Sequence, residues 1–196
     1  MAETEVEKLR RELKLMKLRR QVTPHFLFNC LSVAASLVMT RPKTAVKFLR
    51  GVAEIYRYLL RFGDEYTVPV EQEMAMMKQY FSLMSLRHVG CLRLHVSSAA
   101  KRLKGHPLPP LCLQGLVENA IKHNAHTTAL PLTITVDVED GKLTVTNPLQ
   151  PLLSQEAVST HIGLEYMDET MQLLFNVGIE VIKTDTTFRV AVPLVG

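Results

Sequence analysis

The sequence is poor in the residues that build disulfide frameworks and base-stacking surfaces. Its 196 residues include three cysteines, no tryptophan and only 6% aromatic residues. Cys30, Cys91 and Cys112 lie far apart and form no Cys-x-x-Cys pair, which favours reduced thiols over disulfides or a zinc knuckle. So few aromatic side chains also provide no stacking platform for nucleic-acid bases. These absences favour a chain that works in a reducing compartment and makes no direct contact with nucleic acid.

Long apolar segments are missing as well. The longest mostly apolar run, from Leu31 to Met39, is far too short to cross a bilayer. The start of the chain also lacks the basic and then apolar pattern of a secretory signal. We therefore expect a cytoplasmic chain, attached to a membrane only if a region outside this sequence provides the anchor.

The remaining composition is that of an ordinary folded protein, with 47% hydrophobic residues, 21% charged residues and a net charge of +4. A chain of this length holds one mid-sized domain or two small ones. Its basic residues are concentrated near the start, but acidic residues stand among them. Such mixing is typical of a solvated helix surface and does not predict a nucleic-acid site.

Helical periodicity dominates the first third of the chain. The spacing of Val6, Leu9, Leu13 and Met16 predicts a charged helix with one apolar seam. That seam suits either pairing with a second helix or an ordinary core contact. Pro24 has no backbone N–H to donate and is expected to kink or interrupt the helix.

Two further helices are predicted to form a hairpin around a break at Pro42. One hairpin cannot cover the apolar stripes of both helices, so two copies are expected to pair into a four-helix bundle. The predicted assembly is therefore a homodimer. The two stripes are Leu27, Leu31, Ala34 and Val38, followed by Ala45, Leu49, Val52, Tyr56 and Leu59.

Another helix is predicted after Pro69. Glu71 and Glu73 stand in its first turn, where the helix dipole favours acidic side chains. Its buried stripe is expected at Met74, Met77, Phe81 and Met84.

The second half of the chain alternates between strand and helix patterns. Apolar residues alternate with polar ones in several short segments, and Asp140-Gly141 is typical of a β-hairpin turn. This order favours an α+β fold in which helices cover one face of a mainly antiparallel sheet. Strands are expected at 92–96, 132–138, 143–145, 179–182 and 188–192, with helices at 111–122 and 163–174.

The first sharp motif surrounds His25. Residues 21–29 read Gln-Val-Thr-Pro-His-Phe-Leu-Phe-Asn, which places a histidine directly after a helix-interior proline. A proline that disturbs the helix beside a titratable side chain indicates an exposed imidazole. The alternative is a helix histidine with no chemical role.

The second motif lies at residues 109–123, Pro-Pro-Leu-Cys-Leu-Gln-Gly-Leu-Val-Glu-Asn-Ala-Ile-Lys-His. On a helical wheel its apolar residues share one face, and Glu118, Asn119, Lys122 and His123 share the opposite arc. An amide oxygen at Asn119 suits Mg²⁺, and Lys122 presents a charge to phosphates on the same side. The alternative is an amphipathic helix with an ordinary polar surface.

Both motifs resemble those of LytS-like sensor histidine kinases. The first matches the phospho-acceptor motif Gln-hydrophobic-Asn-Pro-His-Phe-Leu-Phe-Asn except at Thr23, and the second resembles the N-box. Between them, the segment from Tyr56 to Arg61 resembles the family's Leu-x-x-Leu-Leu-Arg-Tyr. The resemblance implies that His25 accepts phosphate, that Asn119 binds the metal, and that Lys122 and His123 lie near phosphate.

The same resemblance implies two domains and a nucleotide. Residues 1–66 would form the dimerisation and phosphotransfer hairpin, and residues 67–196 a Bergerat-type domain, an α/β layer sandwich that binds ATP with Mg²⁺. The third motif of that domain departs from the family pattern. Residues 145–150, Val-Thr-Asn-Pro-Leu-Gln, stand where the family carries Asp-x-Gly-x-Gly, so Asn147 would meet the adenine amino group without a charge.

Two later segments that resemble the family also carry replacements. His161-Ile162-Gly163-Leu164 corresponds to Gly-Ile-Gly-Leu, which keeps Gly163 but loses the first glycine. Asp185-Thr186-Thr187-Phe188 corresponds to Gly-Thr-x-Phe, which keeps Thr186 and replaces the glycine with an acid. A lost glycine removes backbone freedom where a loop approaches phosphates.

Three functions follow from these observations. The first is a histidine kinase that phosphorylates His25 from ATP and passes the phosphate to a response regulator, commonly of the LytTR type in this family. The second is a degenerate dimeric scaffold that binds the regulator and binds ATP poorly. The third is a Bergerat ATPase in which Glu118 activates water. The intact His25 motif favours the first.

Overall fold

The computed structural model describes residues 23–62, 65–150 and 162–196. The chain divides into two compact units, Met1–Ala53 and Glu54–Gly196. The division falls inside one continuous helix, α3, and the functional boundary expected after residue 66 stays a prediction. The helix expected at Val6–Met16 lies outside the described residues.

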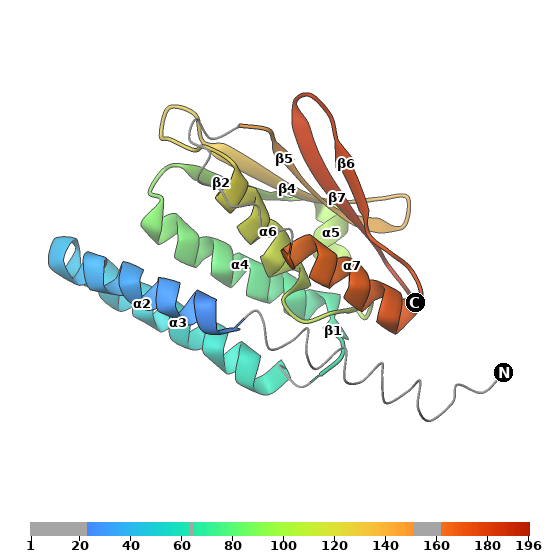
Figure 1. Cartoon of the computed structure of the whole chain (residues 1–196), viewed down its shortest axis with the longest axis horizontal. Helices are drawn as coiled ribbons and strands as arrows, with labels where there is room; N and C mark the ends of the chain where they lie inside the picture. Colours follow the sequence, from blue (N-terminus) through green and yellow to red (C-terminus); the bar gives the residue numbers. More distant parts are fainter. Residues whose placement is uncertain (1–22, 63–64, 151–161) are drawn as a thin grey trace. The chain divides into compact units, whose positions relative to one another are not determined.

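The first unit contains the predicted hairpin. Helix α2 (Thr23–Thr40) and the first part of α3 (Pro42–Phe62) lie side by side and antiparallel (Figure 1). Pro42 begins α3 as expected, because a proline in the first turn gives up an N–H that has no partner in the helix. Pro24 lies in the first turn of α2 as described, so the kink expected before it concerns residues outside the description.

The hairpin has one buried and one exposed apolar surface, and each predicted apolar stripe contains residues of both. Ala34, Ala45 and Val52 are buried as members of those stripes, but Leu31, Val38 and Leu49 are exposed. Residues one position away from the expected stripe take the buried places. The buried residues of the first unit are Cys30, Ala34, Leu37, Ala45, Phe48 and Val52, and the exposed apolar ones are Phe28, Leu31, Val38, Met39, Val46 and Leu49.

The second unit is built on a five-stranded sheet with the order β2-β4-β5-β7-β6. β2 pairs with β4 in parallel, and the other three pairs are antiparallel. Asp140 and Gly141, with φ of +49° and +72°, join β4 to β5 in the predicted two-residue turn. The strands are β2 (Leu92–Val96), β4 (Leu132–Glu139), β5 (Lys142–Pro148), β6 (Glu180–Lys183) and β7 (Thr187–Pro193).

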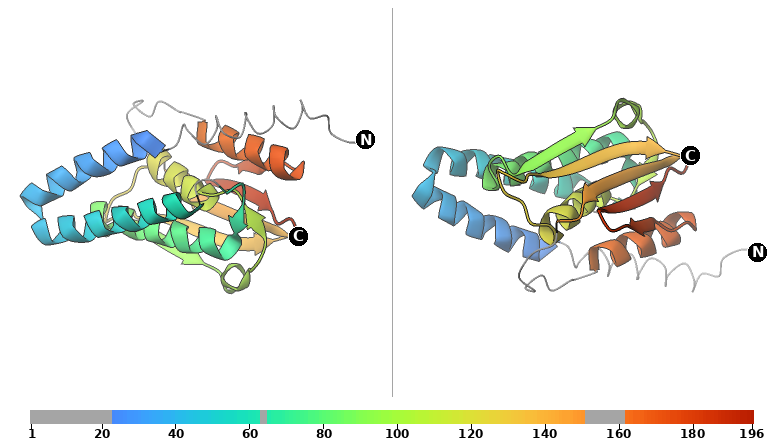
Figure 2. Two further views of the ribbon diagram at one scale, coloured as in Figure 1. Left: turned by 90° about the horizontal axis from the view of Figure 1, so that it is seen from below. Right: turned by 90° about the horizontal axis from the view of Figure 1, so that it is seen from above.

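Three helices cover one face of this sheet: α4 (Val70–Arg87), α6 (Cys112–His123) and α7 (Ile162–Phe175) (Figures 1 and 2). α6 is central, because it contacts α4, α7, β4 and β5. A short helix, α5 (Ser98–Arg102), follows β2, and a two-residue strand pair joins β1 (Val68–Pro69) to β3 (Pro107–Leu108). This architecture confirms the predicted α+β fold.

Helix α4 buries a wider face than its predicted stripe. Met74, Met77 and Met84 are buried as expected, while Phe81 is only half-buried. Tyr80 and Leu83 are buried in addition, and so is the acidic side chain of Glu73.

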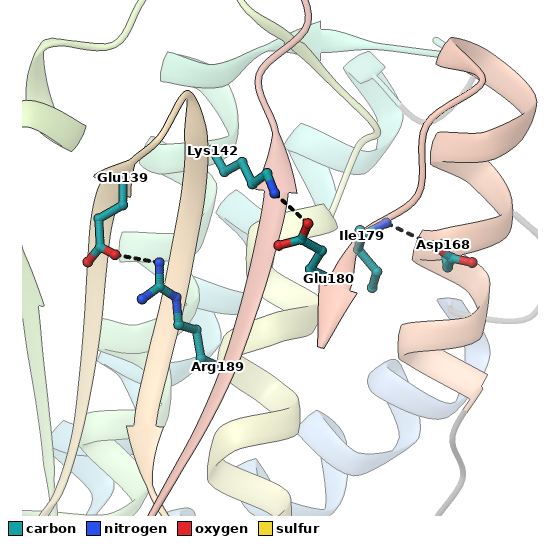
Figure 3. Close-up of polar contacts among 6 residues, drawn as sticks. All are labelled: Glu139, Lys142, Asp168, Ile179, Glu180 and Arg189. Carbon is teal, nitrogen blue, oxygen red and sulfur yellow. Dashed lines mark hydrogen bonds and ion pairs between the residues drawn. The ribbon is translucent and has the colours of Figure 1, made fainter. Parts of the chain in front are cut away.

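Polar contacts link strands of the sheet to one another and helix α7 to the segment before β6 (Figure 3). Two ion pairs at 2.5 Å each reach across one intervening strand, Arg189 to Glu139 over β5 and Lys142 to Glu180 over β7. Because these side chains are partly exposed, such pairs contribute about 1 kcal/mol or less to stability. The backbone N–H of Ile179, just before β6, donates to Asp168 of α7 at 2.8 Å. Among the described helices, none is long and apolar enough to span a bilayer.

Candidate functional site

Helix α6 presents the polar arc that its sequence predicts. Its apolar residues are buried, whereas Asn119 and His123 are half-buried and Lys122 is exposed. Asn119 and Lys122 stand one turn apart, so their polar groups lie on the same side of the helix. The buried residues that hold this orientation are Leu113, Leu116, Val117, Ala120 and Ile121.

The end of α6 is tied to the segment that follows β5. Asn124 is buried and accepts a hydrogen bond from the N–H of Gln150 at 2.8 Å, while its amide nitrogen donates to the carbonyl of Ala120 at 2.8 Å. The N–H of Ala125 donates to the carbonyl of Gln150 at 2.6 Å. These bonds hold the segment after α6 against the segment after β5, the strand that carries Asn147.

The turn between β6 and β7 joins the same region. The N–H of Leu149 donates to the carbonyl of Thr186 at 2.8 Å, and Asn147 pairs with Phe188 in the sheet. Thr186 itself is exposed. Three segments far apart in the sequence therefore meet at one end of the sheet: the end of α6, the end of β5 and the β6–β7 turn.

Asn147 lies deep in this region, with 3% of its surface exposed. Its amide nitrogen donates to the carbonyl of Pro148 at 2.8 Å. This bond orients the amide so that its oxygen is the group that serves as a hydrogen-bond acceptor. The role that the resemblance implies for Asn147, acceptance from an adenine amino group, stays a prediction.

The remaining site residues are not joined to this cluster by the described contacts. His25 lies in the first turn of α2, in the other compact unit, and its side chain is outside the described residues. Gly163 lies in the first turn of α7, and its surroundings are likewise not described. His161, which replaces a family glycine, also falls outside the described residues.

A buried carboxylate of α4 bonds the start of α6. The sequence predicted that this residue, Glu73, would interact with the dipole of its own helix. Glu73 is fully buried and accepts hydrogen bonds from the N–H groups of Leu111 and Leu113, at 2.8 and 3.0 Å, and from the hydroxyl of Tyr58. Burial raises its pKa to about 7, although these hydrogen bonds oppose the shift. The sequence carried a signal for the burial of Glu73, which has helical spacing with the buried Met77 and Tyr80, but none for its partners.

A histidine pair lies beside the exit of α6. His126 bonds His88 at 3.0 Å between ring nitrogens, and its other nitrogen bonds the carbonyl of Asn124 at 2.9 Å. Burial, with a smaller effect from the neighbouring His126, lowers the pKa of His88 to about 4. His88 is therefore neutral near pH 7. Within the described parts of the chain, no three His, Cys, Asp or Glu side chains gather as a metal site would require.

Comparisons with known proteins support the resemblance to histidine kinases. Residues 13–92 match a family model described as histidine kinase. The sensor protein kinase HptS of Staphylococcus aureus is 32% identical over 128 residues, which cover 65% of this chain. The match covers 24% of HptS, so the chain spans about a quarter of the length of the curated relatives it matches.

Solved structures give weaker likenesses. A bacterial phosphotransferase is 12% identical, with 97% of this chain and 98% of that chain covered and a TM-score of 0.48. A histidine kinase from Burkholderia phymatum is 16% identical, with 99% and 100% covered and a TM-score of 0.41. Because both scores are low, the assignment rests on the sequence matches. Those matches support a place in the sensor histidine kinase family, with the family model itself covering residues 13–92.

Proposed function

We propose that this chain is a LytS-like kinase core that phosphorylates His25 from ATP and passes the phosphate to a response regulator. The observation that carries the proposal is the meeting of α6, the end of β5 and the β6–β7 turn. Each of these segments holds a residue that the family motifs place at the nucleotide. The chain spans only part of its curated relatives, so this activity is a proposal for the part of a sensor kinase that the sequence represents.

The phosphate end of the site would be formed by α6. Asn119 would hold Mg²⁺ through its amide oxygen, a ligand type that this ion accepts. Lys122 would contribute positive charge on the same arc, and His123 would lie near phosphate. When bound, Mg²⁺ supplies charge neutralisation for the β- and γ-phosphates. The residues fit this role because the arc is solvent-accessible while the opposite face anchors the helix in the core.

The adenine end of the site would be formed by the sheet. Asn147 would accept from the adenine amino group, and Thr186 would contribute from the adjoining turn. The buried position of Asn147 supports this role, since an acceptor shielded from water discriminates more strongly among ligands. Gly163, at the start of α7, would allow the backbone to approach the nucleotide closely, because glycine has no side chain.

His25 would be the nucleophile. A neutral ring nitrogen attacks the γ-phosphorus in line, the bond to the β,γ-bridging oxygen breaks, and ADP leaves with the electron pair. The displaced ring proton passes to solvent. Imidazole titrates near neutrality, so this attack needs placement more than a strong base. The phosphoryl group then moves to an aspartate of the regulator, which regenerates His25.

The wider assembly follows from the same assignment. Residues 1–66 would form a homodimeric four-helix bundle that carries His25 and docks the regulator, expected to be of the LytTR type. Residues 67–196 would form the Bergerat-type nucleotide domain. The protein would work in the cytoplasm, with any membrane contact made by regions outside this sequence.

One set of contacts favours a second function, an ATP-deficient scaffold that binds the regulator. Where the family has a glycine-rich box, the N–H groups of Leu149 and Gln150 are already bonded to Thr186 and Asn124. A nucleotide that needed those backbone donors would find them engaged. Asp185 adds a negative charge beside the same turn. A scaffold of this kind would keep the dimer and the regulator contact without turnover.

Incubation of the full chain with γ-labelled ATP and Mg²⁺ tests the kinase directly. We expect a phosphate that is labile in acid and stable in base, as a phosphohistidine is, and that disappears in His25→Gln. Label that persists in the variant would show that another residue accepts phosphate. A folded wild-type chain that takes up no label would support the scaffold.

A further inference from the structure

The carboxylate of Glu73 joins three helices of the second unit. It projects from α4, accepts the hydroxyl of Tyr58 from the end of α3, and accepts the N–H groups of Leu111 and Leu113 at the start of α6. The Tyr58 hydroxyl and the Leu111 N–H share one carboxylate oxygen, and Leu113 uses the other. Since Glu73 is fully buried, water does not compete for these bonds.

The start of α6 depends on this carboxylate. The N-cap residue is Leu111, whose side chain cannot accept the first free N–H groups of the helix. Leu111 also adopts a left-handed conformation, with φ of +64°, which a leucine takes only where its surroundings hold it. Glu73 bonds the N–H of Leu111 itself and places an acid at the positive end of the helix dipole.

Tyr58 links α3 to Glu73 through its hydroxyl. Its ring packs against Phe62, one turn later in α3, with 5.0 Å between ring centroids. Burial, reinforced by the Glu73 charge, raises the pKa of the Tyr58 hydroxyl, so this group remains a donor at any physiological pH. While Glu73 is ionised, the Tyr58 hydroxyl is therefore the donor of this bond and the carboxylate of Glu73 is the acceptor.

We propose that Glu73 is a positioning residue through which the last turns of α3 set the start of α6, and with it Asn119. Asn119 lies eight residues after Leu111, about two helical turns along a rigid rod. A shift of α3 that strains the Tyr58 bond is transmitted to the α6 cap rather than absorbed by solvent. The consequence for phosphotransfer rests on the proposed kinase function, but the coupling of α3 to α6 does not.

Two substitutions separate this coupling from simple packing. Tyr58→Phe removes only the hydroxyl and keeps the ring contact with Phe62. Glu73→Gln keeps the shape but turns one acceptor into a donor facing an N–H. The matched control is Glu71→Gln, on the same helix turn as Glu73, whose partner is the N–H of Gly105 rather than α6.

Amide hydrogen exchange on the full chain is the primary measurement, with the unfolding stability of every variant determined alongside. We expect Tyr58→Phe and Glu73→Gln to speed exchange at residues 111–118 at least about threefold beyond any change in global stability. Glu71→Gln should leave these residues at the wild-type rate. Unchanged exchange in Tyr58→Phe, even with faster exchange in Glu73→Gln, would reduce Glu73 to a helix cap and overturn the coupling.

Phosphorylation kinetics provide the second readout. In Tyr58→Phe the rate of His25 labelling at saturating ATP should fall at least about threefold, while the KM for ATP stays within about twofold. A merely destabilised nucleotide site would raise KM instead, and that result would contradict positioning. If the wild-type chain takes up no label, the kinase proposal fails on its own, and hydrogen exchange still decides whether α3 sets α6.

Discussion

Asn147 is the residue at which the kinase and the scaffold differ most sharply. It is buried, the resemblance places it where the family carries an aspartate, and its amide nitrogen donates to the carbonyl of Pro148. An aspartate here would gain charge for an adenine amino group but would lose that donor. We therefore expect Asn147→Asp to bind ATP more tightly while its unliganded form loses about 1–3 kcal/mol of stability.

Asn119→Ala tests the other end of the same site. The side chain is half-buried on the polar arc of α6, so its removal should change the free energy of unfolding by less than about 1 kcal/mol. The affinity for ATP with Mg²⁺ should fall at least about tenfold, because the ion that bridges the phosphates loses a ligand. Calorimetry with a non-hydrolysable ATP analogue measures the affinity of Asn119→Ala and of Asn147→Asp. Binding that is weak in the wild type and unmoved by either substitution would support the scaffold.

Glu73 gives the stability of the chain a distinctive dependence on pH. Its pKa is raised from 4.5 to about 7 in the folded state, so between these values the folded state holds a proton that the unfolded state has lost. The contribution of this group is fully present below pH 4.5 and is lost as pH rises through 7. The full loss is of the order of 3 kcal/mol.

Glu73→Gln cannot ionise and removes this dependence. The stability of the wild type relative to Glu73→Gln should therefore fall between pH 5 and pH 8, as measured by urea unfolding at each pH. The comparison must be made between the two proteins, because His88 acts in the opposite direction. Its pKa is lowered from 6.5 to about 4, which makes stability rise with pH over that range. A constant difference between wild type and variant would show that Glu73 is ionised in the folded state throughout.

Among individual residues, those of the polar arc of α6 were predictable from the sequence, and the environment of Glu73 was not. The arc follows from helical spacing alone, since Leu113, Val117 and Ala120 fix which side is buried. The partners of Glu73 come from Tyr58, 15 residues before it, and from α6, 38 and 40 residues after it. No local pattern specifies contacts at such separations. The sequence therefore predicted only that Glu73, in the first turn of its helix, would interact with the dipole of that helix.

Among the elements, the five strands of the main sheet and helices α4, α6 and α7 were predicted in their order, whereas α5 and the β1–β3 pair were not. The patterns of β4, β5 and β7 are strong because these strands carry buried residues, and Asp140-Gly141 is typical of a two-residue hairpin turn. The register of the hairpin was less predictable. Phe48 is fully buried and Leu49 is exposed, although both belong to an apolar helix surface. Which of two adjacent apolar residues faces a partner is decided by tertiary packing, which the spacing of apolar residues does not contain.

The connection from α7 to β6 depends on a close approach at Gly178. A Cβ built there would lie 2.7 Å from the carboxylate of Asp168 and 2.7 Å from the amide nitrogen of Gln172. Asp168 is not free to move away, because it accepts the N–H of Ile179 (Figure 3). We expect Gly178→Ala to lower the free energy of unfolding by about 1–3 kcal/mol.

Gly115 provides the matched control in thermal or urea unfolding. It lies in α6, and a Cβ there would meet nothing within 4 Å. Gly115→Ala should therefore raise stability by roughly 0.5–1 kcal/mol through helix propensity. If Gly178→Ala proved as harmless as Gly115→Ala, the Asp168 contact would have to be more adaptable than its hydrogen bond indicates.

On the scale of the whole molecule, the exposed apolar surface of the hairpin sets the expected assembly. Phe28, Leu31 and Val38 of α2 are 68%, 49% and 50% exposed, and Val46 and Leu49 of α3 are 51% and 43% exposed. The hairpin already has its own buried residues, so this second surface is not needed to join α2 to α3. An apolar surface of this kind is expected to be covered by a second copy of the hairpin.

We therefore expect sedimentation of the intact chain to give a dimer at micromolar concentration. Leu31→Glu and Leu49→Glu place charges on the exposed surface without touching the buried residues of the hairpin, and each should weaken dimerisation at least about tenfold. Leu130→Glu is the matched control, since Leu130 is also exposed but lies outside the hairpin. Circular dichroism should show that all three variants keep their helices. Because phosphotransfer and regulator docking are both proposed for this bundle, a wild-type chain that stays monomeric would remove the structural basis for either function.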